Sequence, residues 1–467
     1  MNTDYKMKHL FAPQRFAGRI FVLSVAFVCS SLLGWAQSGR PGAPAALPAN
    51  ATLEECVQFA LRNQPLVRQA TIDEAIGERQ IRIGLSDWLP QVQGVGSYTR
   101  NLILPTTVLP NFQDPTAGQQ LVRIGLKNTS TVGLQGTQLL YSNDVLLAAR
   151  SMRFVRLNNS QNTTAFKIDV VTNVSKAFYD ILLTQEQLRI LDEAIVRQEK
   201  QLKDAFAQYE VGITDKIDYK RASISVKNAR AQRKTTAESL KGKYATLKQL
   251  MGYAPENNLA LAYDTAQMIQ QTRLDTTRQL SFENRIEVQQ LLTQKKLQRI
   301  NIDYYRLGFL PSLSGFVNYN RVYQNNDFSA LYDRAFPNSQ AGFQLALPIF
   351  TGTRRTQNLK IAELQDERLD LDLFDTKNQI NSEYEQALAT YKSALNDLAT
   401  QQENARDAQE IYGIVKLQYD EGIKTYLEVI VAETDLRTSQ LNYYNSLFAV
   451  LASKLDVERA LGTIALN

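Results

Sequence analysis

Hydrophobic residues along this chain recur with two different periods. Between residues 143 and 210 a spacing of seven links Ile181, Leu188, Ile195, Leu202 and Tyr209. Such spacing predicts a long helix that packs as in a coiled coil. A second long helix is predicted over residues 353–419, because proline is absent there and Gly413 is the only glycine. At a rise of 1.5 Å per residue, each helix would span roughly 100 Å.

Short segments in which apolar and polar residues alternate come before each long helix. Phe343, Leu345 and Leu347 alternate with smaller or polar residues, which predicts a strand. Leu-Pro steps at 89–90 and 310–311 end the preceding helices, since proline removes a hydrogen-bond donor. The alternating segments are about 10 residues long, which suits tilted membrane strands. The expected strands cover residues 91–101, 129–139, 312–322 and 339–347.

The chain is an internal duplication. Residues 88–94 (WLPQVQG) return as residues 309–315 (FLPSLSG), and residues 208–213 (QYEVGI) return as residues 418–423 (QYDEGI). The matches keep their order, so the sequence indicates two copies of one unit. The offset between matches changes where the first copy has the longer loop, residues 102–128.

This duplication gives the domain layout. The first repeat is expected at residues 51–252 and the second at 281–463, joined by a connecting segment at 253–280 that wraps the middle of the helical part. Each repeat should begin with a helix and end with a return helix; these are predicted at residues 53–87, 215–250, 282–308 and 425–461.

The first residues have the pattern of a secretory signal peptide. Lys6, Lys8, Arg15 and Arg19 precede an apolar run too short to span a bilayer, and Ala36 is the expected cleavage position. A retained membrane anchor is the alternative. Removing residues 1–36, which also contain Asp4, lowers the formal charge from +5 to +2. A flexible lead-in is expected at residues 37–50.

The composition of the remaining chain argues against catalysis and against metal or cofactor binding. His9 is the only histidine, and it leaves with Cys29 in the signal peptide, so Cys56 remains alone. Histidine-based triads, His-containing zinc sites and internal disulfides are thereby excluded. No phosphate-binding glycine loop is present. The sequence predicts no catalytic, cofactor or metal site, no enzyme activity and no nucleic-acid partner.

Four strands are too few to close a membrane barrel, for which single chains use at least eight. Several copies must therefore contribute strands, and three copies would supply twelve. Geometry alone does not fix this number.

The order of these features resembles the TolC outer-membrane efflux family over residues 51–463. The resemblance rests on the opening Thr52-Leu-Glu-Glu-Cys-Val-Gln-Phe-Ala-Leu-Arg-Asn-Gln-Pro65, the duplicated Gly-Ile turns and the closing Ala460-Leu-Gly462. It implies an α+β membrane protein: a homotrimer with a helical α-barrel in the periplasm and a shared twelve-stranded transmembrane β-barrel in outer-membrane lipid. The implied partners are a periplasmic adaptor and an inner-membrane pump of RND or ABC type.

The resemblance also suggests which residues carry function. The helix turns would contact the adaptor, through Gly212, Ile213, Thr214, Gly422, Ile423 and Thr425. The gate candidates are Glu428, Asp218, Tyr419 and Lys424. Val431 departs from the family pattern, in which a second acidic residue would stand there, so a single acidic ring from Glu428 is expected to favour cations.

Two alternatives stay open. A periplasmic coiled-coil scaffold without a pore would have the long helices but no membrane strands. Within transport, the same architecture serves drug or metal efflux and type I protein secretion, and the channel sequence does not identify the substrate.

Overall fold

The structure is a computed structural model that describes residues 47–48, 50–110, 119–262 and 265–466. The chain divides into two units, Met1–Pro48 and Ala49–Asn467, and every element below belongs to the second unit. The expected signal peptide, residues 1–36, and most of the lead-in at 37–50 lie outside the described residues.

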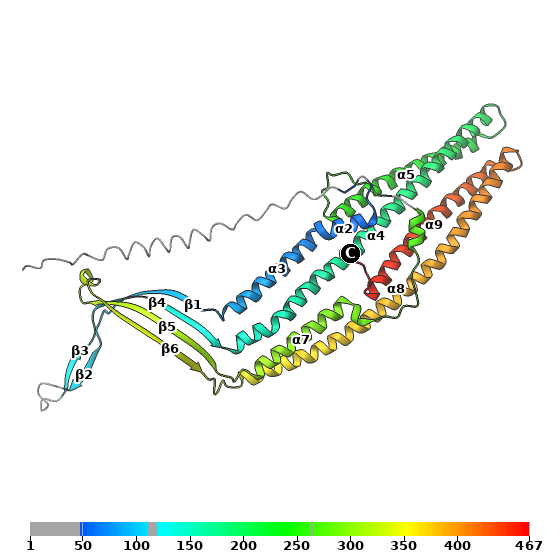
Figure 1. Ribbon diagram of the computed structural model, residues 1–467. Helices are drawn as coiled ribbons and strands as arrows, with labels where there is room; N and C mark the ends of the chain where they lie inside the picture. The colour runs from blue at the N-terminus through cyan, green and yellow to red at the C-terminus, as the bar shows by residue number, and fades with distance from the viewer. Residues whose placement is uncertain (1–46, 49, 111–118, 263–264, 467) are drawn as a thin grey trace, which may run out of the picture. The chain divides into compact units, whose positions relative to one another are not determined.

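Four antiparallel strands form one sheet in the order β1, β4, β5 and β6 (Figure 1). The central pair, β4 with β5, joins the two repeats and places Gly133 opposite Asn320. Strands β1 and β6 are the two edges. The strands are β1 (Gln91–Arg100), β4 (Asn128–Tyr141), β5 (Ser312–Asn325) and β6 (Ala335–Ala346). Large apolar side chains stay exposed on this sheet, among them Val92, Val132, Val317, Phe343 and Leu345.

The segment 102–128, expected as a loop, contains a two-stranded hairpin. Its strands are β2 (Thr106–Pro110) and β3 (Gln119–Arg123), with Thr106 opposite Arg123. Pro110 ends β2, at a position where a strand tolerates the missing donor. Residues 111–118 between the strands lie outside the described part of the chain.

The long helices begin and end beside the residues that the sequence indicates. They are α4 (Asn143–Glu210) and α8 (Arg354–Asp420), and the return helices are α5 (Lys216–Met251) and α9 (Tyr426–Leu461). Ser142 caps α4 by accepting a hydrogen bond from the Asp144 N–H at 3.2 Å. None of the described helices is long and apolar enough to cross a membrane.

The helices that open each repeat are broken, which the sequence prediction of one continuous helix missed. Pro65 lacks an N–H, so the chain leaves the helix at Gln64 and starts again, with the Gln64 side chain accepting from the Val67 N–H at 3.1 Å. The second repeat breaks at Arg285. The resulting elements are α2 (Leu53–Asn63), α3 (Pro65–Ser86), η1 (Phe282–Asn284) and α7 (Ile286–Arg306).

Each break receives the end of a return helix. Gly252 (φ +67°) caps α5, and a Cβ added there would lie 2.7 Å from the Asn63 carbonyl oxygen. Gly462 (φ +69°) caps α9, and its added Cβ would lie 2.6 Å from the carbonyl oxygen of Asn284. Only glycine combines the left-handed conformation with so close an approach.

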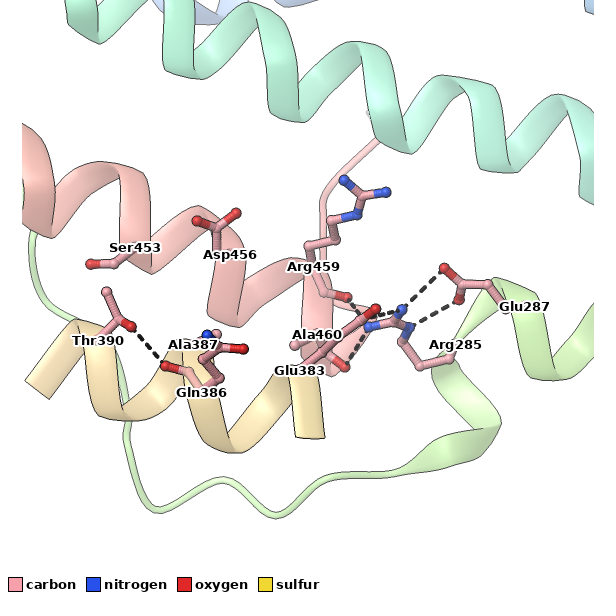
Figure 2. Close-up of a pocket in the computed structure, with 10 residues that line it drawn as sticks. All are labelled: Arg285, Glu287, Glu383, Gln386, Ala387, Thr390, Ser453, Asp456, Arg459 and Ala460. Carbon is pink, nitrogen blue, oxygen red and sulfur yellow. Dashed lines mark hydrogen bonds and ion pairs between the residues drawn. The ribbon is translucent and has the colours of Figure 1, made fainter. Parts of the chain in front are cut away.

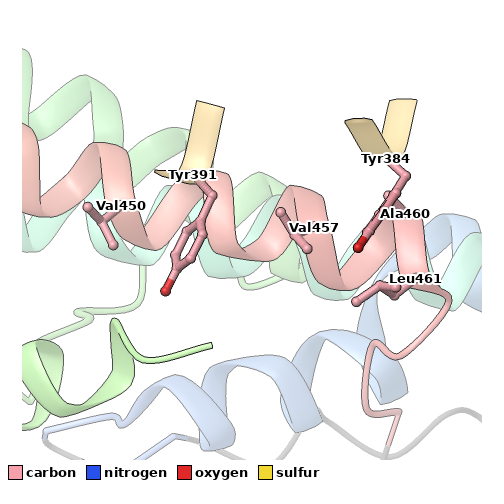
Figure 3. Packing of buried hydrophobic residues seen from close by; sticks show 6 residues of the cluster. All are labelled: Tyr384, Tyr391, Val450, Val457, Ala460 and Leu461. Atoms are coloured by element: carbon pink, nitrogen blue, oxygen red, sulfur yellow. The ribbon is translucent and has the colours of Figure 1, made fainter. Parts of the chain in front are cut away.

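The helices form one layer in which α4 is central. Helix α4 packs against α3, α5, α7 and α9, and α8 packs against α7 and α9 (Figure 1). Helices α5 and α8 are therefore at opposite ends of the layer in the half that contains the helix turns. A buried cluster between α8 and α9 lies where α9 ends (Figure 3); its members are Tyr384, Tyr391, Val450, Val457, Ala460 and Leu461.

The connecting segment 253–280 includes α6 (Thr265–Gln271) and crosses α8 near this cluster. The hydroxyl of Tyr391 donates to the Thr272 carbonyl at 2.7 Å, and the hydroxyl of Tyr384 donates to the Arg278 carbonyl at 2.9 Å. These bonds tie the segment to the middle of the helical layer.

Candidate functional site at the helix turns

Both turns between a long helix and its return helix are built alike. Gly212 has φ +77°; its N–H donates to the Tyr209 carbonyl at 3.0 Å, and the Ile213 N–H donates to the Gln208 carbonyl at 2.9 Å. This pair of bonds is a Schellman motif, which needs the left-handed residue that glycine supplies. The second turn repeats both bonds at 2.9 and 2.8 Å, between Gly422 and Tyr419 and between Ile423 and Gln418.

The isoleucines of the two turns are exposed. Ile213 is 74% exposed and Ile423 is 72% exposed, although this position of a Schellman motif usually makes an apolar contact with the preceding helix. Val211, Ile217 and Leu427 beside them are also exposed. The turns therefore present apolar side chains that the described chain does not cover.

Glu428 is held by its own turn. Its carboxylate accepts hydrogen bonds from the Lys424 ammonium at 2.6 Å and from the Thr425 N–H at 2.9 Å and hydroxyl at 3.1 Å. The Lys424 ammonium, followed by the Thr425 N–H, lowers the pKa of Glu428 to about 2. The charge of this carboxylate is thus balanced by a cation four residues away on the same helix end.

Tyr419 connects the two hairpins of the chain. Its hydroxyl donates to the Gln208 side-chain oxygen at 3.2 Å, and its ring lies 5.9 Å from that of Tyr426. Tyr426 is buried in a small cluster with Ala205 and Ala222. Burial raises the pKa of Tyr419 most, and the negative charge of Asp218 raises it further.

Asp218 occupies in the first repeat the place that Glu428 occupies in the second. Thr214 stands where the second repeat has Lys424, so the equivalent ion pair is absent from the described structure. The buried hydroxyl oxygen of Thr214 has no hydrogen-bond partner among the described residues. The structure therefore brings Lys424, Thr425 and Glu428 together and leaves Asp218 outside that group.

Sequence reasoning missed a buried ion pair farther from the turns. Glu433 of α9 is 2% exposed and lies 3.4 Å from the Arg197 guanidinium of α4. Burial raises the pKa of Glu433 more than Arg197 lowers it. The sequence does contain a signal: the buried residues Tyr426, Val429 and Leu436 of α9 follow a heptad pattern, and Glu433 occupies the position of that pattern between Val429 and Leu436.

A polar cleft of about 470 Å³ lies where α9 ends (Figure 2). The Arg285 guanidinium donates to the carbonyls of Arg459 and Ala460 at 3.3 and 3.2 Å, and to the carboxylates of Glu287 and Glu383. This arginine closes the last turn of α9, whose carbonyls have no partner within the helix. The cleft is thus a structural joint within the second repeat, where the break at Arg285 meets α8 and the end of α9.

The described residues contain no cluster of His, Cys, Asp and Glu that could hold a metal ion. Cys56 is buried, and burial raises the pKa of its thiol to about 12. A thiol held in its protonated form is a poor nucleophile and a poor metal ligand.

Comparison with known proteins places this architecture in a family. The sequence profile described as outer membrane efflux protein matches residues 56–253 and 277–463, which are the two repeats. The chain belongs to the outer membrane efflux protein family. It is 21% identical over 415 residues to the probable efflux pump outer membrane protein TtgC of Pseudomonas putida, covering 88% of this chain and 82% of that protein.

Two further comparisons also cover most of this chain and most of the matched protein. The outer membrane protein TolC of Vibrio cholerae is 20% identical over 339 residues, covering 72% of this chain and 77% of that protein. The crystal structure of the Campylobacter jejuni CmeC outer membrane channel superposes with a TM-score of 0.70 at 19% identity, over 88% of this chain and 85% of that chain. The fold of this outer membrane efflux protein is therefore that of a known channel.

Proposed function

We propose that this protein is the outer-membrane channel of a tripartite export system. Three copies form one conduit, which passively conducts substrates from an inner-membrane pump, through a periplasmic adaptor, to the cell exterior. The conduit carries out no chemistry of its own. The pump, of RND or ABC type, supplies both the energy and the substrate specificity.

The observation that carries this proposal is the open sheet. Strands β1 and β6 have unpaired edges, and apolar side chains such as Val132 and Phe343 are exposed beside them. A free edge bearing apolar residues is not tolerated in water or in lipid. Pairing β6 of one copy with β1 of the next satisfies both edges, and three copies pool twelve strands.

The long helices fit the same arrangement. Helix α4 continues from the sheet to the helix turns without interruption, and at 1.5 Å per residue its length is about 100 Å. A conduit of this length extends from the outer membrane far into the periplasm. The turns at Gly212 and Gly422 are then the end that meets the adaptor.

The first test is the mass of the detergent-extracted particle from the outer-membrane fraction, together with its conductance in a planar bilayer. A trimer that conducts ions supports the proposal. A monomer in the soluble fraction would refute it and would favour a periplasmic scaffold without a pore.

We also propose that the exposed isoleucines of the turns contact the adaptor. An apolar side chain that is more than two-thirds exposed gains most from burial in an interface. Replacing Ile213 and Ile423 by aspartate should abolish capture of the cognate adaptor while leaving the trimer intact. Ile72→Asp is the matched control, because Ile72 is 58% exposed on α3, far along the chain from either turn. Equal capture by both variants would refute the contact.

For the gate we propose that Lys424 and Glu428 act as a pair. Three copies would place three such pairs at one end of the conduit, and each pair has no net charge. The acidic ring expected from Glu428 alone is then largely neutralised. Tyr419 adds a bond between the two hairpins of each copy through Gln208.

A further inference from the structure

The return helix of the first repeat is unusually basic. Asp218 and Glu238 are the acidic residues of α5, whereas lysine or arginine stands at residues 216, 220, 221, 227, 230, 233, 234, 241, 243 and 248. Arg230, Arg233, Lys241 and Lys243 form ion pairs within the chain. Because α5 is an end helix of the layer, exposed lysines that have no such partner are available to whatever lies beyond this chain.

The basic residues of α5 include a regular row. Ala222, Val226 and Ala229 are buried on the face toward α4. On the opposite face residues recur at spacings of three and four and are exposed; this basic row is Lys220, Ile224, Lys227, Ala231 and Lys234. Ile224 is 58% exposed. Lysine and small or apolar residues thus alternate in the period of a coiled-coil seam.

Helix α8, the other end of the layer, carries a complementary row. Ala408 is buried, and the opposite face exposes the acidic row Glu403, Arg406, Glu410, Gly413 and Leu417. Within the described chain, Glu403 and Glu410 form no ion pair, and neither do Lys227 and Lys234 of the basic row.

Gly413 is the second observation. It lies in the interior of a 67-residue helix, where glycine is unfavourable relative to alanine. A Cβ added there would meet nothing within 4 Å in this chain. The packing of one copy therefore gives no reason for a glycine, whereas a side chain from outside would use the space it leaves.

The two rows are level with each other. Tyr412 and Tyr419 of α8 bond to Gln201 and Gln208 of α4, both 211 residues earlier. Arg230 of α5 pairs with Glu199 of α4, and Arg233 pairs with Asp192. A residue of α4 therefore lies at the same height along the layer as the residue of α8 that is 211 positions later in the sequence. By this rule Glu199 is level with Glu410, and Asp192 is level with Glu403. Lys227 is hence within a turn of the level of Glu410, and Lys234 of the level of Glu403.

Rotation about an axis along the helices keeps these levels unchanged. In a closed ring of identical copies, a residue of α5 then meets the residue of α8 at its own level on the next copy. Antiparallel matching places Lys227 against Glu410, Lys234 against Glu403 and Ile224 against Gly413. The small residue Ala231 meets Arg406, so no two cations face each other.

We propose that the basic row of α5 in one copy packs against the acidic row of α8 in a second copy, with Ile224 filling the space over Gly413. This seam rests on the trimer proposed above and specifies its register in the periplasmic half. It uses charge complementarity to exclude the alternative pairings of α5 with α5 and of α8 with α8, where like charges would meet.

The test is a cysteine cross-link in the full-length protein, with Cys56→Ala as background. Lys227→Cys together with Glu410→Cys should give disulfide-linked dimers and trimers on mild oxidation. Asn228→Cys with Glu410→Cys is the control, because Asn228 is exposed at the same level on a different face of α5. A charge exchange completes the test: Lys227→Glu and Glu410→Lys singly should each weaken the trimer, and together they should restore it.

Each outcome is decisive. Selective cross-linking with rescue by the exchanged pair supports the seam. A trimer of normal mass that neither cross-links nor responds to the single reversals overturns the seam and leaves the proposed channel standing. No trimer in the unmodified protein overturns both. Reversals that leave the trimer intact but abolish binding of the adaptor would assign the basic row to that partner and overturn the seam.

Discussion

Replacing Gly462 by alanine tests the joint at which each return helix meets the start of its repeat. The new Cβ would lie 2.6 Å from the Asn284 carbonyl oxygen, a backbone atom that cannot swing aside. The backbone at Gly462 has φ +69°, which costs an alanine roughly 1–2 kcal/mol. Relieving the contact requires a shift of packed elements, which costs about 1–3 kcal/mol more.

Gly422 supplies the matched control. Its φ is +76°, but an added Cβ there meets nothing within 4 Å. Gly422→Ala should therefore lose only the roughly 1–2 kcal/mol of the left-handed conformation. Both substitutions also restrict the unfolded chain equally, and this contribution cancels in the comparison.

The assay is thermal unfolding of the detergent-extracted protein, followed by far-ultraviolet circular dichroism. Protein concentration and heating rate must be the same for all variants, because both affect the midpoint of an oligomer. The midpoint should fall slightly for Gly422→Ala and further for Gly462→Ala. Gly252→Ala should resemble Gly462→Ala, since its Cβ would lie 2.7 Å from the Asn63 carbonyl oxygen. Equal midpoints for Gly422→Ala and Gly462→Ala would refute the reasoning.

Three further predictions concern charged groups. The pKa of Glu433 is raised in the folded protein, so the contribution of this residue to stability is lost as the pH rises. Glu433→Gln should therefore raise the unfolding midpoint more at pH 7.5 than at pH 5, and a difference between variant and unmodified protein that is the same at both pH values would contradict this. Lys424→Met should increase cation preference in bilayer recordings and Glu428→Gln should decrease it by a similar amount, since each substitution removes one charge from a neutral pair; unchanged reversal potentials would count against the pair. Arg285→Met should lower the midpoint, because the buried carbonyl of Ala460 loses its donor at about 1–3 kcal/mol and the partly buried carbonyl of Arg459 loses its donor as well. Arg459→Met, which replaces an exposed arginine, should have little effect, and equal losses from the two substitutions would contradict this role of Arg285.

The sequence was most informative about long regular elements. Absence of glycine and proline over residues 143–210 predicts a helix there, and α4 spans Asn143–Glu210. Helix formation and its termination at Gly212 depend on residues within one or two turns, so local patterns carry both. The duplication is confirmed by a family match that covers each repeat separately.

Contacts between distant segments were not accessible in this way. Pro65 is visible in the sequence, but a kink, a stop and a new helix are all compatible with it. Gly252 packs against the backbone of Asn63 at the break, and this contact forms only when the hairpin of α4 and α5 has folded. The hairpin β2–β3 was missed because each strand has only five residues and the first follows Pro105 and ends at Pro110.

The contacts of the gate candidates also differ in whether they join residues that are near or distant in the sequence. Lys424 and Glu428 are four residues apart at a helix start, a spacing from which their ion pair could have been predicted. Tyr419 and Gln208 are 211 residues apart, and their bond exists only because α4 and α8 lie at a common level. The same holds for Arg197 and Glu433.

The sequence by itself determined the long helices, the return helices, the four strands of the main sheet, their duplication and the family, because periodicity, caps and turns are local properties of the chain. The tertiary structure decided which charges are neutralised, which glycines allow close approach and which faces remain open. Those properties depend on packing between segments hundreds of residues apart, and the register that sets Lys227 level with Glu410 can be obtained only from such contacts.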